Sequence, residues 1–255
     1  MIDTHSHVYA EEFDDDFKDV INRATNAGVE KIVLANVDMS SLEKVIACWK
    51  NDPDTFIPTI GLHPTEVNND FMNILNEMNK IIDLYPFKAL GETGLDLYWD
   101  KTYLKQQIES FQWHIDKSIE HDLPLIIHVR DSFEEIKNVL KENKSKPLRG
   151  VIHSFTGSEK DAFDIIETGN FMFGINGIVT FKNSKLAEVV KAIGIERLVL
   201  ETDAPYLAPV PFRGKRNEPA YMDSTKNKLA EIFMISPDEV DKITTKNAKH
   251  LFNIQ

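Results

Sequence analysis

The chain alternates short apolar runs with longer amphipathic stretches, and no other feature restricts its fold as strongly. Eight apolar runs have the length and composition of buried β-strands, at 2–5, 31–37, 56–62, 88–92, 123–129, 150–154, 171–175 and 197–202. Several of these runs are continuously apolar instead of alternating with polar residues. Strands of this kind are usually covered on both faces, as in parallel sheets.

Amphipathic patterns with apolar residues three or four positions apart fill the intervals. Gly28 fits the position just after the first such helix, and Ser40 and Ser41 fit the start of the second. Ser236-Pro237 separates the last two, because serine caps a helix and proline suits its first position. The patterns predict helices over 13–27, 40–50, 103–120, 132–141, 159–168 and 183–193, and two more within 223–252.

Eight strands that alternate with helices in 255 residues predict an α/β fold, namely a (β/α)8 TIM barrel. We expect a single domain that spans residues 1–255. The alternative is an open doubly wound sheet. The loop after the first strand lacks the glycine-rich phosphate-binding motif that such a sheet often carries, so the barrel is favoured.

Composition excludes some classes of protein. The net charge of -12 argues against a protein that coats nucleic acid with a broad basic face, but it allows an enzyme that binds phosphates locally. No apolar run reaches the roughly 18 residues of a membrane span, and the N-terminus lacks a secretory signal pattern. The single cysteine, Cys48, fits a reducing compartment. We therefore expect a cytoplasmic protein with no membrane association, and nothing in the sequence indicates an obligate protein partner.

Side chains that bind metals gather where the predicted strands end. In a parallel barrel these ends converge on one face, where active sites are built. The sequence therefore predicts a metal site at that mouth. Its candidate ligands are His5, His7, Glu92, His128, His153 and Asp203, and His63 also lies at a predicted strand end there.

The individual positions support metal binding to different degrees. His5 and His7 are two residues apart on an extended segment, so both rings can reach one cation. A carboxylate such as Glu92 at the end of an apolar strand is costly to desolvate unless it is paired or metal-bound. The ordinary interpretations are exposed loop histidines, a helix N-cap or salt bridge at Glu92, and satisfied core histidines at His128 and His153. Their coincidence at matching strand ends favours metal ligands.

Asp203, His63 and Glu201 are candidates for roles beyond metal binding. Asp203 follows the last strand, where it can bind a metal and accept a proton from the bound water. His63, in Gly-Leu-His-Pro, is predicted to position substrate or to offset charge in the transition state, with a local hydrogen bond as the alternative. For Glu201, direct function and a buried ion-pair role are both open.

A small basic cluster follows the eighth strand in this acidic chain. Arg213, Lys215 and Arg216 would lie at the predicted mouth, where they can contact phosphate oxygens, and Arg130 can add to them. The alternative is an ordinary solvated surface.

Six sequence blocks run from one end of the chain to the other: IDTHSH at 2–7, GLHP at 61–64, GETGLD at 91–96, PLIIHVRD at 124–131, GVIHSFTGS at 150–158 and ETDAPYLAPVPFRGKRNEP at 201–219. In content and order these blocks resemble the TatD-type metal-dependent deoxyribonucleases, within the amidohydrolase-like barrel hydrolases. Two departures from the family pattern, Thr65 and Phe212, replace residues that are often histidine and affect no expected metal ligand.

The resemblance implies two divalent cations, Mg, Mn or Zn, and hydrolysis of DNA phosphodiester bonds by a metal-activated water. It pairs His5, His7 and Asp203 at one metal and His128 and His153 at the other. Glu92 would bridge the two metals. We expect attack from a strand end with little sequence specificity, because phosphate contacts do not read bases.

Two other functions are open at this point. The first is a barrel hydrolase of a small molecule, such as a cyclic amide, a lactone or a phosphotriester, because a barrel does not fix its substrate. The second is a metal-binding protein without turnover. The basic cluster favours a phosphate substrate, and an activity assay on a generic phosphodiester would separate the alternatives.

Overall fold

The computed structural model describes residues 1–254. Eight parallel strands follow the chain in order: β1 (Ile2–Ser6), β2 (Lys31–Leu34), β3 (Phe56–Pro58), β4 (Leu90–Asp96), β5 (Leu125–Arg130), β6 (Arg149–Ile152), β7 (Asn170–Ile175) and β8 (Leu198–Leu200). The α-helices are α1 (Phe17–Asn26), α2 (Met39–Asn51), α3 (Phe71–Ile81), α4 (Leu104–Glu120), α5 (Phe133–Glu142), α6 (Glu159–Ile166), α7 (Leu186–Ile193), α8 (Met222–Phe233) and α9 (Pro237–Phe252). Short 3-10 helices are η1 (Glu11–Phe13), η2 (Pro64–Glu66), η3 (Gly177–Thr180), η4 (Ile195–Arg197) and η5 (Pro219–Tyr221).

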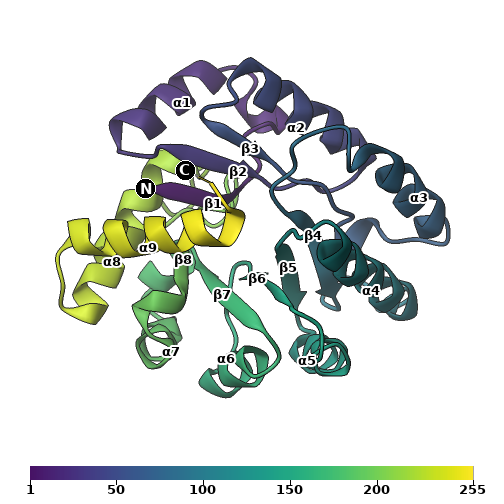
Figure 1. Cartoon of the computed structure of the whole chain (residues 1–255). Helices are drawn as coiled ribbons and strands as arrows, with labels where there is room; N and C mark the ends of the chain where they lie inside the picture. Colours follow the sequence, from purple (N-terminus) through teal and green to yellow (C-terminus); the bar gives the residue numbers. More distant parts are fainter. Residues whose placement is uncertain (255) are drawn as a thin grey trace.

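The strands form a barrel with the helices outside it (Figure 1). Hydrogen bonds join consecutive strands in two groups, β1-β2-β3 and β4-β5-β6-β7-β8, and every pairing is parallel. Parallel bridges close the two seams, between Ile60 and Leu90 and between Ser6 and Ala204. The predicted (β/α)8 TIM barrel is confirmed.

One end of the barrel is filled by apolar side chains and covered by α9, which crosses the strand ends nearest the viewer in Figure 1. Ile126, Val151 and Val199 belong to this layer, in one apolar cluster with Leu251 and Phe252 from the last turn of α9. Side chains two residues apart on a strand lie on the same face. His128 is two residues beyond Ile126, and His153 is two residues beyond Val151, so both histidines point inward at the opposite, open end of the barrel. The closed end therefore stabilises the barrel, and the open end receives the polar side chains.

The sequence missed α3, although Phe71, Leu75 and Met78 are buried at helical spacing. It also placed the end of the fourth strand at Glu92, whereas β4 continues to Asp96 because Thr93–Asp96 pair with Ile127–Arg130. The third strand was predicted too long, since β3 ends at Pro58 and the chain reaches His63 through a loop. Gly28 follows the C-cap of α1 with a φ of +86°, as predicted. Within residues 1–254, no helix combines the length and the apolar character needed to cross a membrane.

We expect Gly94→Ala to lower the free energy of unfolding by about 3 kcal/mol. Gly94 has a φ of +134°, and a Cβ there would collide with the carbonyl oxygen of His128 on the neighbouring strand. Gly214→Ala is the matched control, because Gly214 has a φ of +82° with no atom near the added carbon. Urea unfolding of the three proteins tests this, and equal midpoints for the two variants would contradict it.

Candidate metal centre

The open mouth of the barrel brings together all seven residues that the sequence placed there. His5 and His7 come from the end of β1, and their Nε2 atoms are 3.3 Å apart. Both rings face Asp203, whose Oδ1 lies 3.8 Å from His5 Nε2 and 3.5 Å from His7 Nε2. The ring of His153 stacks on His5 with centroids 3.4 Å apart.

Glu92 lies at the middle of this cluster and is buried. Its Oε2 is 3.0 Å from His5 Nε2, and its Oε1 is 2.8 Å from His128 Nδ1. Oε1 is also 3.3 Å from His63 Nε2 and 3.8 Å from His153 Nε2. One carboxylate thus presents each of its oxygens to a different set of imidazoles.

Three overlapping groups have donor atoms close enough to hold a cation. Within each group, the ligand atoms lie within 4.8 Å of one another. His5 and Glu92 each belong to two of the three groups. The groups are His5, Glu92 and His153; His5, His7 and Asp203; and His63, Glu92 and His128.

The outer nitrogens of several rings lie close to oxygen atoms of neighbouring groups, an arrangement typical of metal-binding histidines. His7 Nδ1 lies 3.1 Å from the carbonyl oxygen of Ala35, and His153 Nδ1 lies 3.1 Å from Glu201 Oε1. His128 Nε2 lies 3.0 Å from Asp96 Oδ2. Each contact fixes the ring and leaves its other nitrogen facing the cluster, so the donor set fits divalent cations that accept imidazole and carboxylate.

Electrostatics keep the central carboxylates charged. Burial would raise the pKa of Glu92, but the rings of His5, His63 and His153 outweigh burial and hold it well below its usual range. Burial also opposes ionisation of Asp203, but nearby His153 and then His7 keep its pKa below the usual value. These carboxylates are therefore charged at neutral pH and offer negative charge to cations.

His63 differs from its neighbours because of its outer contact. The backbone N–H of Thr65 donates to His63 Nδ1 at 3.2 Å, so Nδ1 is an acceptor. The pKa of His63 is lowered mainly by burial, so the ring is neutral and its proton resides on Nε2. Nε2–H faces the cluster, 3.2 Å from His128 Nδ1 and 3.3 Å from Glu92 Oε1. His63 is therefore arranged as a hydrogen-bond donor within the cluster.

In the basic loop after β8, which carries Arg213, Lys215 and Arg216, one cation is paired with a carboxylate and two are exposed. The Arg216 guanidinium makes two 2.8 Å hydrogen bonds to the carboxylate of Asp16, so it anchors the loop to the segment before α1. Arg213 is exposed, with its guanidinium carbon 4.0 Å from the ring centroid of Phe181. Lys215 is exposed as well. Only Arg213 and Lys215 thus have their charges available at the surface.

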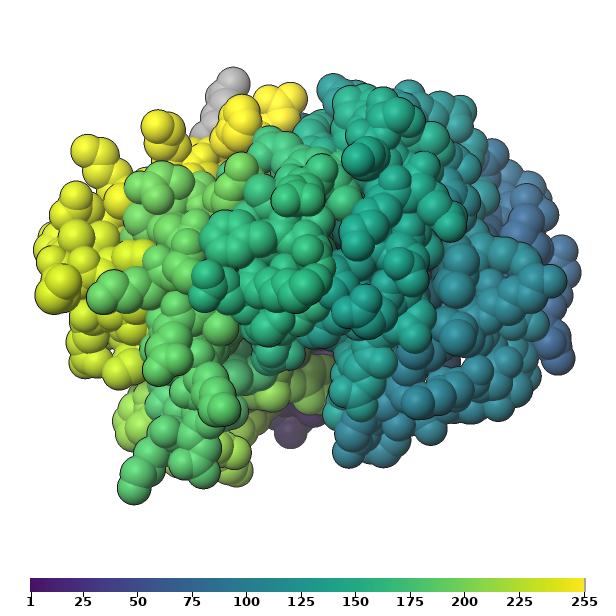
Figure 2. Space-filling model, turned by 90° about the horizontal axis from the view of Figure 1, so that it is seen from below, coloured from purple at the N-terminus to yellow at the C-terminus, as the bar shows by residue number. Residues whose placement is uncertain are grey.

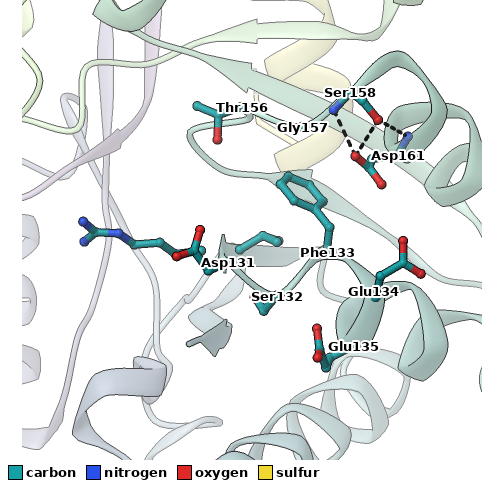
Figure 3. A pocket seen from close by; sticks show the side chains of 11 residues that line it. Asp131, Ser132, Phe133, Glu134, Glu135, Thr156, Gly157, Ser158 and Asp161 are labelled. Carbon is teal, nitrogen blue, oxygen red and sulfur yellow. Dashed lines mark hydrogen bonds between the residues drawn. The ribbon is translucent and has the colours of Figure 1, made fainter. Parts of the chain in front are cut away.

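The surface around the mouth is hollowed. In Figure 2 the lower edge is indented between a green and a teal-blue protrusion, with purple atoms from near the N-terminus visible between them. A cavity of about 600 Å³ lies between the loops that follow β5 and β6, with Phe133 on one side and Ser158 hydrogen-bonded to Asp161 on another (Figure 3). A smaller cavity of about 200 Å³ is lined by residues that include Asp96 and Trp99.

Sequence reasoning missed Asp96 and left Glu201 undecided. Asp96 follows Glu92 by four residues along β4, so strand periodicity places both on one face and could have revealed it. Glu201 accepts the backbone N–H of Ser154 at 2.6 Å and contacts His153. Glu201 therefore supports a ring of the cluster. Arg130, expected to add to the basic cluster, instead lies over Tyr98.

We expect metal binding to the stripped protein to release protons and to strengthen as pH rises from 6 to 8. Burial lowers the pKa of His153, but Glu201, Asp203 and Glu92 outweigh it and raise the pKa to about 10. The metal-free ring is thus protonated below that pH, and a cation must displace the proton. Calorimetry in buffers of different ionisation enthalpy counts the protons. Glu201→Gln should reduce the count and weaken metal binding by about 10–100-fold, and an unchanged count would contradict this account.

The fold and the cluster define a class: a parallel barrel hydrolase with a histidine-carboxylate metal centre at the C-terminal ends of its strands. The family model described as TatD related DNase matches residues 2–253, and the chain belongs to this family of metal-dependent hydrolases.

Individual relatives agree. The chain is 39% identical to the metal-dependent hydrolase YabD of Bacillus subtilis, covering 100% of this chain and 99% of the relative. It is 30% identical to the metal-dependent hydrolase YcfH of Escherichia coli, covering 100% and 96%. The crystal structure of YjjV, a TatD homolog from Escherichia coli, superposes with a TM-score of 0.93 at 28% identity, covering 100% of this chain and 98% of that one.

Proposed function

We propose that this enzyme hydrolyses phosphodiester bonds of DNA, from a strand end and with little sequence specificity. The observation that carries the proposal is the position of Glu92, with one oxygen 3.0 Å from His5 and the other 2.8 Å from His128. Membership of the TatD related DNase family supports DNA as the substrate. Two cations, Mg, Mn or Zn, would together polarise a phosphodiester and activate a water.

The residues divide between two cation positions that share Glu92. His5, His7 and Asp203 would hold one cation through Nε2, Nε2 and Oδ1. His128 would contribute Nδ1 and His153 Nε2 to the other. The neighbours Asp96 and Glu201 would orient these two rings. This pairing uses every imidazole nitrogen that faces the cluster except that of His63.

Asp203 and His63 would carry out the proton and charge steps. The Asp203 carboxylate is charged and partly exposed, so it can orient the attacking water and accept its proton. His63 Nε2–H can donate to a phosphate oxygen, which offsets the negative charge that develops there. Arg213 and Lys215 would hold flanking phosphates, while Arg216 holds the loop in place through Asp16.

A small-molecule substrate is the second candidate because of the 600 Å³ cavity between the loops that follow β5 and β6. A cavity of that size would accept a drug-sized ester, lactone or cyclic amide. Its walls carry Asp131, Glu134 and Asp161, which would repel a phosphate. This second candidate therefore applies only to uncharged or cationic substrates.

The deciding experiment strips the metals with a chelator and incubates the protein with short single-stranded DNA. Mg, Mn or Zn is then restored singly, with the His128→Ala, His153→Ala double variant as control. We expect cleavage that requires metal and is absent from the variant, with a product ladder that shortens from one end. Tight metal binding with intact DNA would instead assign the centre to a small-molecule hydrolase.

We expect the double variant Arg213→Ala, Lys215→Ala to raise KM for DNA equally across sequences and leave kcat nearly unchanged. Losing two phosphate contacts should also reduce the slope of log affinity against log salt by about 2. Kinetics at several salt concentrations measure both effects. Lys18→Ala, on the outer helix α1, is the control, and an unchanged salt slope in the double variant would exclude these residues from phosphate binding.

A further inference from the structure

Two large aromatic side chains are exposed at the mouth, directly after β4. Trp99 is 71% exposed and Tyr98 is 53% exposed, although rings of this size normally contribute by being buried. Their centroids lie 4.8 Å apart, with the rings nearly perpendicular. Arg130, from the end of β5, places its guanidinium carbon 3.9 Å from the Tyr98 centroid and 5.3 Å from the Trp99 centroid.

This aromatic pair is fixed to the metal centre through a single carboxylate. The backbone N–H of Tyr98 donates to Asp96 Oδ1 at 3.0 Å, and Asp96 Oδ2 lies 3.0 Å from His128 Nε2. Arg130 follows His128 by two residues on the same strand. The backbone at Tyr98 is therefore held by the same carboxylate that holds a ring of the cluster, and Arg130 lies on the strand that carries this ring.

Two of these three side chains also line hollows in the surface. Arg130 lines the 600 Å³ cavity, and Trp99 lines the 200 Å³ cavity with Asp96.

Electrostatic attraction alone would contribute little to the affinity of this enzyme for a DNA strand. The chain carries a net charge of -12, and Arg216 is already paired with Asp16. Stacking on aromatic faces, helped by a guanidinium, binds any nucleobase whatever its identity. Only unpaired bases offer their faces, because paired bases are stacked inside the duplex.

We propose that Tyr98, Trp99 and Arg130 form a stacking site for an unpaired nucleobase of the strand that is hydrolysed. The site rests on the proposed function, and it supplies affinity that is independent of sequence. An aromatic surface that contacts a second copy of the chain is the competing explanation. That explanation lacks a reason for the link through Asp96 to His128.

The test measures binding of the metal-loaded protein to a short phosphorothioate strand, which is hydrolysed slowly. Trp99→Ala should weaken binding about 5- to 100-fold, while Trp99→Phe should bind within about 3-fold of the wild type because it keeps a ring. Phe163→Ala, which removes an exposed ring from the outer helix α6, should change nothing. The same strand without bases should bind the wild type as weakly as Trp99→Ala binds the normal strand.

Three results would overturn the stacking site. The first is wild-type affinity of Trp99→Ala for the strand. The second is an equal loss of affinity in Trp99→Ala for the strands with and without bases, and the third is a changed oligomeric mass of Trp99→Ala with unchanged binding. Turnover of bis(p-nitrophenyl) phosphate by the wild type tests the proposed function separately. If no phosphodiester is hydrolysed but binding still depends on Trp99 and on the bases, the proposed function fails and the nucleobase site stands.

Discussion

Glu92→Gln is expected to lower kcat/KM on DNA by about 10³-fold or more and to reduce the bound metal from two ions to one or none. An amide has no charge, and its nitrogen would turn a donor toward His5 or toward His128, which lie 3.0 Å and 2.8 Å from the two carboxylate oxygens. Metal content after dialysis and steady-state kinetics measure the two effects.

Glu135→Gln is the matched control for this prediction. Glu135 lines the neighbouring cavity and belongs to none of the candidate metal groups in residues 1–254. It should keep both metals and full turnover, and circular dichroism should show that both variants are folded. A Glu92→Gln protein with two metals and more than a tenth of the wild-type activity would refute the bridging role.

Asp203→Asn is expected to lower kcat by about 10²–10⁴-fold while much of the metal is retained. Asparagine keeps an oxygen near His7 but cannot accept a proton. The carboxylate is unprotonated at neutral pH, because His153 and His7 hold the pKa of Asp203 below its usual value despite burial. Parallel measurements of kcat and metal content separate this outcome from that of Glu92→Gln.

Asp203→Ala supplies the comparison for the asparagine variant. It removes both the ligand oxygen and the base, so it should lose metal and turnover together. If Asp203→Asn retains its metals and also its full activity, another group accepts the proton and Asp203 is only a ligand.

The sequence was sufficient for the barrel architecture and for bringing seven predicted side chains to one mouth, although it missed Asp96. Strand and helix periodicity identified all eight strands and all but one of the α-helices in residues 1–254, because each element carries its own local pattern. The missed helix α3 has such a pattern too, with Phe71, Leu75 and Met78 buried, so the sequence contains the information needed to predict it. Element ends were less certain, since the length of β4 depends on its pairing with β5.

The arrangement inside the centre required the tertiary structure. No spacing along the chain shows that Asp96 supports His128, that Glu201 supports His153, or that Thr65 fixes the proton of His63. Each of these contacts except the last joins residues more than 30 positions apart, so it exists only once the barrel has closed.

The basic loop shows the same division. Composition singled out Arg213, Lys215 and Arg216 as equivalent cations, but the fold pairs Arg216 with Asp16, 200 residues away. The sequence by itself determined which residues reach the mouth, because a strand's two-residue repeat carries polar side chains beyond the apolar layer. Only the tertiary structure decided which of them can contact a substrate, since ion pairs between distant segments neutralise some charges and leave others exposed.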